Sequence, residues 1–535
     1  MAATATEKEQ DVAAPTTVQQ GVLASPIEDQ RESKDVAALN VEPEPPFTIF
    51  SPAQKTFIIM MTSLAALFSP LTANIYYPAL DTLASDLHVS HGLINLSITT
   101  YLIFQGLAPS FIGSLSDETG RRPSYIICFI IYLGACIGLA LQNSYAALMV
   151  LRCLQSSGSS GTVALANAVV ADMVTSSERG SYIGYVSMGA LLGPTIGPII
   201  GGLLNEFLGW RSIFWFCTIF GGVTLVILLL FMPETCRKIV GNGSFAPQPW
   251  NVSALDYFAR RRAHRNGIHA DEKATLNFKS RPNPLQSVYI LIEKESGIVL
   301  MYAGLLFAGF YMVITAIPSQ LQDKYGLSTL QVGLCYIPSG IGSLLAAIVV
   351  GRFMDWNFRR HAKMCGLELL KTKQPDLDDF PLEAARLQVV LPLSLAACLF
   401  TIAYGWVLQE RTHLAGPLIL TFFITFCTSA TFQGTSTLVV DLNRDAPGAA
   451  TAAMNLARCW LGAGGTAMVI PMLNKMGNGW VCVFVAGVWA LMSPVTLYVI
   501  RRGPAWRKEK REKTERKKRE EEAARRATMG LEDGL

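Results

Sequence analysis

Long apolar runs constrain this chain more than any other feature of its sequence. A run of about 20 apolar residues is long enough to cross a hydrocarbon core of about 30 Å as an α-helix. Of the 535 residues, 51% are hydrophobic and only 16% are charged, which is more apolar surface than one soluble core can bury. The sequence therefore predicts an all-α membrane protein with twelve transmembrane helices. We place these helices at 56–78, 92–114, 123–142, 146–170, 182–204, 210–232, 297–321, 331–352, 386–408, 415–439, 449–473 and 479–500.

Lysine and arginine gather in alternate loops between these runs. Because cytosolic loops of membrane proteins carry an excess of both residues, this asymmetry places both termini and the long middle loop in the cytosol, and an even number of spans agrees. The opposite loops carry only Lys324, Arg411 and Lys475, with Arg211 at the edge of a run. The basic loops contain Arg121, Arg122, Arg179, Arg237, Lys238, Arg260, Arg261, Arg262, Arg265, Arg359, Arg360, Lys363, Lys371 and Lys373.

The runs divide the chain into five segments. We expect a disordered cytosolic tail at 1–50, a six-helix bundle at 51–235 and a cytosolic middle loop at 236–296. A second six-helix bundle follows at 297–500, and a charged cytosolic tail at 501–535. Within that tail, 505–526 mixes Lys, Arg and Glu at helical spacing, which favours a solvated helix over one that touches anionic lipid.

A short pattern recurs at equivalent places in the two bundles. It follows the second and the eighth runs, as Gly113-x-x-x-Asp117-x-x-x-Arg121-Arg122 and Gly351-x-x-x-Asp355-x-x-x-Arg359-Arg360. A duplicated six-helix unit is the architecture of transporters whose halves rock around a site at the middle of the membrane.

The first copy of this pattern is the more complete. Gly120 allows a tight turn before the two arginines, and Pro123 then starts a helix where its missing N–H does no harm. A generic basic turn would explain the charges alone, but the whole pattern resembles the cytosolic loop signature of the major facilitator superfamily. The resemblance implies a charge cluster that locks the two halves in one state, formed here by Asp117, Arg121 and Asp172.

The fourth run contains an arginine, in Leu151-Arg152-Cys-Leu-Gln155-Ser-Ser-Gly158. A charge inside a span costs at least about 2.5 kcal/mol, so Arg152 should face a cavity or a partner. An arginine extending to the nearby interface is the alternative, because Arg152 is close to the end of the run. The pattern resembles the fourth-span motif of the superfamily, which implies a role for Arg152 in proton coupling.

The fifth run repeats glycine every four residues and adds two prolines. The glycines form one groove for close helix packing, and the prolines bend the helix. A generic glycine contact needs no Gly-Pro pairs, whereas this run closely resembles the antiporter motif of the superfamily and favours export over uptake. The motif residues are Gly189, Gly193, Pro194, Gly197, Pro198 and Gly201.

Shorter matches extend the resemblance over residues 50–500. They are Asn74-x-Tyr76-Tyr77-Pro78-Ala79, Gly209-Trp210-Arg211, Pro233-Glu234-Thr235, Asp441, Asn455-Leu-Ala-Arg458-Cys and Gly477-Asn-Gly-Trp480. Together they resemble the fungal drug:proton antiporters with twelve spans. Multidrug antiporters often carry a carboxylate inside the first span, but this chain has none there, which leaves Asp81, Asp172 and Asp441 as candidate proton carriers.

Polar and aromatic residues at mid-span depth are candidates for the substrate cavity. Aromatic faces attract cationic or planar ligands, and polar groups orient them. For each residue, ordinary packing or a hydrogen bond between helices is the more frequent role. The candidates are Asn74, Tyr101, Gln105, Gln155, Tyr311, Gln433 and Asn455.

These features favour a proton-coupled antiporter that exports drugs, toxic metabolites or related small organic compounds. The alternatives are a proton-coupled uptake symporter for a nutrient or a polyamine, and a receptor-like protein that does not transport. No clustered His or acidic residues lie within the runs, and no GxxxxGK[ST] loop is present, so we expect neither an enzyme nor an ATP-driven pump. We expect a monomer in the cell membrane, rather than the vacuolar membrane, with no cofactor, no metal and no nucleic-acid partner.

Overall fold

The computed structural model describes residues 48–174, 179–245, 247–248, 251–253, 285–366, 380–443 and 447–532. The chain divides into two compact units, Met1–Pro46 and Phe47–Leu535, and every described residue belongs to the second. All regular secondary structure in these residues is helical. The tail expected at 1–50 and most of the middle loop lie outside the described residues.

The first six predicted spans fall on a continuous series of helices. The first helix starts at a capping box, in which the side chains of Ser51 and Gln54 each accept a hydrogen bond from the backbone N–H of the other. Pro52 is the first residue of the helix. Near its other end, a short 3₁₀ turn, η1 (Tyr77–Ala79), leads into α3 (Leu80–Asp86). The series is α2 (Pro52–Asn74), α4 (His91–Thr119), α5 (Arg121–Leu141), α6 (Tyr145–Met173), α7 (Arg179–Leu208) and α8 (Arg211–Phe231), followed by the single turn α9 (Arg237–Val240).

The last six predicted spans also fall on helices, and the boundary predicted between 449–473 and 479–500 lies at Gly477. Two breaks fall inside predicted spans, after Leu334 within 331–352 and after Met492 within 479–500. Gly477 has φ 75° and ψ 171° within α17, so this element is two helices joined at that residue. Only glycine adopts such a backbone readily. The elements are α11 (Gln286–Ile292), α12 (Lys294–Tyr325), α13 (Thr329–Leu334), α14 (Ile337–Met364), α15 (Leu382–Gln409), α16 (Ala415–Leu442), α17 (Pro447–Met492) and α18 (Pro494–Glu532).

The helices are long and apolar enough for a membrane protein. Nine segments among the described residues meet both criteria, and the last of them, Gly448–Lys513, contains the break at Gly477 and both of the last two predicted spans. The helices α6 and α7 have 29 and 30 residues, which also suffices to cross a bilayer. The predicted all-α membrane fold is confirmed.

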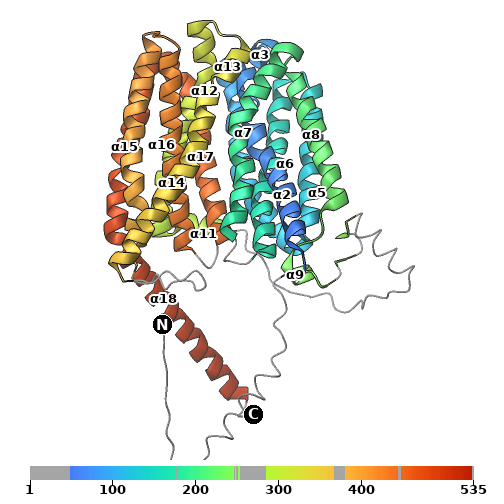
Figure 1. Cartoon of the computed structure of the whole chain (residues 1–535), viewed down its shortest axis with the longest axis vertical. Coiled ribbons are helices and arrows are strands. Elements are labelled where there is room, and N and C mark those ends of the chain that lie inside the picture. Colours follow the sequence, from blue (N-terminus) through green and yellow to red (C-terminus); the bar gives the residue numbers. More distant parts are fainter. Residues whose placement is uncertain are drawn as a thin grey trace, which may run out of the picture. The chain divides into compact units, whose positions relative to one another are not determined.

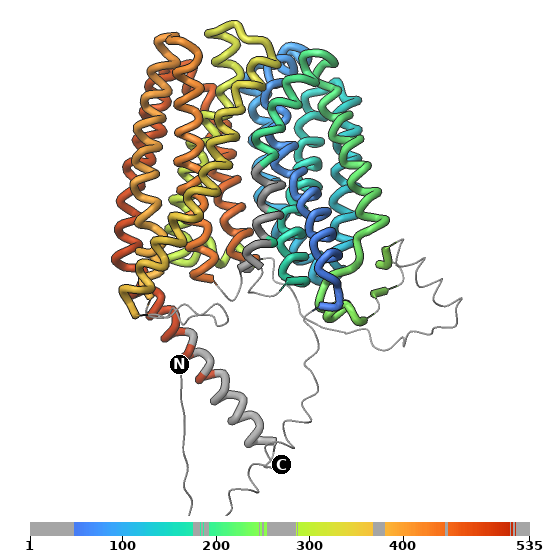
Figure 2. Tube along the Cα trace, viewed as in Figure 1, coloured from blue at the N-terminus to red at the C-terminus, as the bar shows by residue number. Residues whose placement is uncertain are grey.

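The spanning helices form two bundles, which follow one another in the sequence. Figure 1 shows α2 and α4 to α8 in blue to green on one side, and α12 to α17 in yellow to red on the other. Figure 2 shows the same separation along the Cα trace. One buried core contains Phe68, Phe129 and Trp210, and another contains Leu300 and Trp489, so each bundle packs around its own apolar centre.

The bundles also contact each other toward the end at which α3 and α13 lie, at the top of Figure 1. There the core of the first bundle continues into Ile317 and Tyr336 of the second. Tyr77 stacks on Tyr336, with ring centroids 6.3 Å apart and planes 4° apart. We call this the α13 end, and the opposite end the α9 end. The two halves are packed together at the α13 end.

The two copies of the sequence pattern place their arginines at different structural positions. In the first half a new helix starts at Arg121, but α14 continues to Met364, so Arg359 and Arg360 remain on it. The partner of Asp441 is Arg386, near the start of α15, at 3.1 Å. Because α15 follows α14 as α5 follows α4, Arg386 is the counterpart of Arg121.

The predicted helix at 505–526 forms as part of α18, but its start is anchored rather than fully solvated. The Arg507 guanidinium bonds the fully buried carboxylate of Glu383 at 2.6 Å, and donates to the Phe380 carbonyl oxygen at 2.7 Å. Lys510 pairs with Glu293 ahead of α12. These contacts hold the start of the tail against the α9 end of the second bundle.

Candidate substrate and coupling sites

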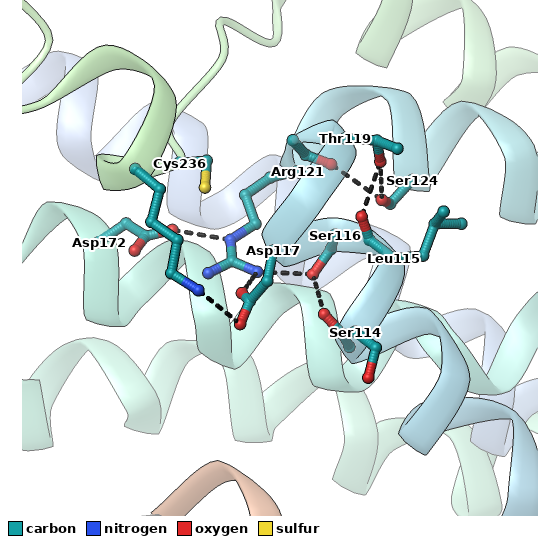
Figure 3. Close-up of polar contacts among 12 residues, drawn as sticks. Ser114, Leu115, Ser116, Asp117, Thr119, Arg121, Ser124, Asp172 and Cys236 are labelled. Carbon is teal, nitrogen blue, oxygen red and sulfur yellow. Dashed lines mark hydrogen bonds and ion pairs between the residues drawn. The ribbon is translucent and has the colours of Figure 1, made fainter. Parts of the chain in front are cut away.

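The predicted charge cluster forms at the α9 end of the first bundle. The Nη1 atom of Arg121 lies 2.7 Å from Asp117 on α4, and its Nε atom lies 2.8 Å from Asp172 on α6. The side chains of Arg121 and Asp172 are only 9% and 12% exposed, so solvent screens this pair weakly. Figure 3 shows the guanidinium between the two carboxylates.

Two further charged groups complete the cluster. Lys238 on α9 reaches Asp117 at 3.2 Å. Glu234 is 4% exposed, and its carboxylate accepts hydrogen bonds from the backbone N–H groups of Arg121 and Arg122. A side chain at Gly120, where φ is 107°, would overlap that carboxylate. The sequence pointed to Glu234 only as part of the motif match Pro233-Glu234-Thr235. Its contact with the cluster could not be predicted, because that contact depends on the path of the chain after α8.

The cluster ties together helices of one half. All of its named residues lie between α4 and α9, and they join three spanning helices to the segment that leaves the bundle. The Cys236 thiol lies beside Arg121 (Figure 3), and burial raises the pKa of this thiol, so it stays neutral. The contacts observed are therefore a clamp within the first half, and a lock between the halves stays a prediction.

The neutralisation of Asp117 tests this clamp. We expect Asp117→Asn to remove the ion pairs of Asp117 with Arg121 and Lys238, worth about 1–2 kcal/mol. The transport rate should then change roughly 5- to 30-fold. Initial rates in proteoliposomes measure the change. The matched control is Asp355→Asn, at the same motif position in the second half but exposed to solvent. Equal kinetics for the two variants and the unmodified protein would contradict a coupling role for the clamp.

Arg152 is fully buried inside the first bundle. It lies seven residues after the start of α6, about 10 Å along the helix. Its guanidinium carbon lies 4.2 Å from the ring centroids of both Tyr76 and Tyr101. Nη1 donates to Gln155 at 2.7 Å, but Nε and Nη2 have no hydrogen-bond partner. Arg152 therefore points into the protein, and does not extend to the interface.

Several predicted cavity residues gather near Arg152 on α4 and α6. The Tyr101 hydroxyl lies 3.0 Å from Ser159, and the Gln105 amide donates to Ser69 at 3.1 Å. The side chain of Asn455 on α17 crosses to the other half, and donates to the Gln105 carbonyl oxygen at 2.8 Å. Tyr101, Gln105, Gln155 and Asn455 thus belong to one connected polar region where the halves meet.

The other cavity candidates lie apart from these contacts. Asn74 donates to the Pro70 carbonyl oxygen of its own helix at 2.7 Å. This is the structural hydrogen bond that the sequence left open as an alternative to ligand binding. Gln433 on α16 lies beside Gly351 on α14. Tyr311 on α12 packs against Gly462 of α17, one turn beyond Arg458. Arg458, which the sequence did not place in the cavity, lies one turn from Asn455 and donates to it at 2.6 Å.

The glycines of α7 bring its backbone against two different helices. A side chain at Gly193 or Gly197 would press on the backbone of α2 around Leu71, and one at Gly201 would overlap the Ile75 carbonyl oxygen. Gly202 faces the other way, toward Thr329 and Gly333 of α13. Gly189, Pro194 and Pro198 lie on the same helix. The motif therefore holds α7 between its own bundle and the second one.

Asp81 occupies the α13 end of the interface between the halves. Its carboxylate lies 2.8 Å from Nδ1 of His91, and its other oxygen is buried without a hydrogen-bond partner. A small pocket beside the pair is lined by Asn95 of the first half and by Thr315 and Ser319 of the second. Of the three candidate proton carriers, Asp172 and Asp441 pair with arginines, whereas Asp81 pairs with a titratable histidine.

Comparison with known proteins agrees with this architecture. The profile of the Major Facilitator Superfamily matches residues 62–467. The MFS-type transporter R5 of Phoma sp. is 46% identical over 469 residues, covering 88% of this chain and 89% of that protein. The MFS-type transporter clz19 of Cochliobolus lunatus is 44% identical over 496 residues, covering 93% and 92%. Citrate exporter 1 of Aspergillus niger is 39% identical over 474 residues, covering 87% and 89%.

Solved structures show the same fold at low sequence identity. The partially occluded, inward open xylose transporter XylE from E. coli is 15% identical, with a TM-score of 0.55, and the match covers 84% of this chain and 97% of that one. The human organic anion transporter MFSD10 is 16% identical, with a TM-score of 0.51 and coverages of 85% and 100%. The profile match, the fungal relatives and the two-bundle fold agree, and this chain belongs to the major facilitator superfamily of membrane transporters.

Proposed function

We propose that this chain exports small organic compounds in exchange for protons, by alternating access, as a fungal drug:proton antiporter with twelve spans. The observation that carries the proposal is the position of α7. Its glycines pack on α2 within one half, while Gly202 contacts α13 of the other. Close backbone contacts without bulky side chains let two rigid bundles tilt against each other. The antiporter-like sequence of this helix favours export as the direction.

Topology follows from the basic residues near the α9 end. Arg121, Lys238 and Arg507 all lie there, so the positive-inside rule places this end in the cytosol. The two halves are packed together at the opposite, outer end. Closure at the outer end is what alternating access requires of an exporter while it receives its substrate from the cytosol. Among cell membranes we favour the plasma membrane over the vacuolar one, and we propose that the protein works as a monomer.

Proton entry from outside has a candidate in the pair formed by Asp81 and His91. The pair lies at the outer end, in the interface between the halves, and one oxygen of Asp81 has no hydrogen-bond partner. Asp81 and His91 both belong to the first half, so protonation of the carboxylate would change the charge that this half presents at the outer contact. Because a ligand shifts a conformational equilibrium only by binding the two states differently, such a group supplies the required coupling.

Flux in proteoliposomes tests the direction and the coupling together. Purified protein is reconstituted with an imposed pH gradient and a panel of radiolabelled drugs, polyamines and organic acids. We expect movement away from the compartment that faces the α9 end, driven by acid on the other side and abolished by a protonophore. Proton-driven movement into that compartment would instead identify an uptake symporter, and binding without any flux would identify a receptor-like protein.

A further inference from the structure

The apolar runs of the two bundles contain arginines but no acidic residues. No Asp or Glu occurs within the twelve apolar runs, whereas Arg152 and Arg458 lie more than four residues inside the edges of theirs. The acids of the neighbouring helices, such as Asp117, Asp172 and Asp441, are near helix ends and pair with other basic groups. The middle of the protein therefore has a positive field that no side chain within the runs neutralises.

Arg458 is a partly buried cation whose surroundings suit an anion. Its guanidinium carbon lies 5.2 Å from the ring centroid of Phe307 and 5.6 Å from that of Phe432, one on α12 and one on α16. Nη2 donates to Asn455, and Nε is buried without a hydrogen-bond partner. No carboxylate lies within ion-pair distance of Arg458 in the part of the chain that the structure describes. Two aromatic faces offset only part of the cost of placing this charge away from bulk water.

The place of Arg458 joins it to the region where the halves meet. Asn455 accepts from Arg458 and donates to the Gln105 carbonyl oxygen across the interface. Tyr101, one turn from Gln105 on α4, contacts the second unpaired arginine, Arg152. Arg458 is partly exposed, whereas Arg152 is fully buried. Arg458 is thus the group that a ligand can reach, and Arg152 adds to the positive potential behind it.

We infer that the substrate is an organic anion whose carboxylate binds Arg458, beside Asn455 and Gln105. The planar fork of arginine matches the two oxygens of a carboxylate, and the flanking rings of Phe307 and Phe432 accept an apolar body. The same field repels organic cations, which separates this substrate class from cationic drugs and polyamines. The inference rests on the proposed transport function, but makes a separate statement about binding.

Binding and transport are therefore measured separately. Titration calorimetry on the purified full-length protein in detergent uses citrate and benzoate as anionic probes, and tetraphenylphosphonium as an aromatic cation. We expect a carboxylate to bind and the cation not to bind. Arg458→Gln should weaken carboxylate binding at least tenfold, and Arg458→Lys should restore part of it by keeping the charge. The control is Arg501→Gln, which removes an exposed arginine near the α9 end.

The outcomes separate this inference from the proposed export. Absence of carboxylate binding, or binding that Arg458→Gln leaves intact in a protein that elutes as a single peak, overturns the anion site. Binding that depends on Arg458, with no flux of the same anion in proteoliposomes, keeps the anion site and overturns the exporter. Flux of tetraphenylphosphonium driven by a pH gradient, unaffected by either carboxylate, keeps the exporter and overturns the anion site.

Discussion

Replacing Arg152 with alanine is expected to abolish transport without lowering the amount of protein in the membrane. The fully buried guanidinium lies between Tyr76 and Tyr101 at 4.2 Å from each ring. We expect the loss to fall on the rate-limiting step of transport, where about 3 kcal/mol corresponds to a rate roughly 100-fold lower. Initial rates of efflux in proteoliposomes, per mole of reconstituted protein, measure the effect.

Membrane insertion and thermal stability of the variant distinguish a functional role of Arg152 from a structural one. A charged residue within a span costs about 2.5–3.5 kcal/mol, so its removal makes insertion easier. If Arg152 served only to hold α6 in place, the alanine variant would insert but unfold readily in detergent. We expect it to keep its thermal stability, and Arg152→Lys to recover part of the activity. Normal efflux by Arg152→Ala would show that the buried charge has no part in transport.

The position of Arg152 also bears on energy coupling. Because the apolar runs contain no acid, the positive interior cannot itself release and take up the coupling proton near neutral pH. That task falls to groups at the membrane edges, among which Asp81 lies at the interface between the halves. An anionic substrate would also leave a cell with the help of an inside-negative potential, by about 2.3 kcal/mol per charge for each 100 mV. In the proposed exporter, proton exchange and the membrane potential would then act in the same direction.

The sequence predicted the fold well, because long apolar runs and basic loops report directly on the bilayer. The prediction of helix ends was wrong where a helix continues beyond the apolar run into water, as α14 does. Arg359 and Arg360 lack the neighbouring glycine and proline that make the turn at Gly120 and Pro123, and charged residues continue a helix in water, so α14 runs on past them. The break at Gly477 falls between two predicted spans, whereas the break at Ser493 lies inside the predicted span 479–500 and was missed, although Ser-Pro favours a turn.

The candidate site was predicted less completely than the fold. The charge cluster was predicted from the resemblance of the Gly113–Pro123 loop to the superfamily signature, and the structure brings Asp117, Arg121 and Asp172 together. The ring of Tyr76 against Arg152 could not be found, because it depends on how α2 and α6 are rotated about their axes. Arg458 was overlooked because an isolated arginine gives no sign of its surroundings, although its place within an apolar run was a usable signal.

The exchange of Gly201 for alanine should prevent stable folding, although it adds a single methyl group. That methyl would overlap the Ile75 carbonyl oxygen, and α2 and α7 would have to separate to relieve the contact. Alanine favours a helix over glycine by about 1 kcal/mol, so any loss of stability must come from this collision. We expect a penalty of about 3 kcal/mol or more. Thermal unfolding in detergent, followed by size-exclusion chromatography, measures it.

Two neighbouring substitutions make this result specific. Gly222→Ala on α8, where no atom lies within 4 Å, should leave stability unchanged or slightly higher. Gly202→Ala meets α13 of the other half, so it should disturb the state packed at the α13 end and alter transport while the first bundle stays folded. Since these glycines differ mainly in which helix they face, a stable Gly201→Ala protein would show that α2 and α7 are not in backbone contact. The close packing that we describe between α7 and α2 would then be wrong.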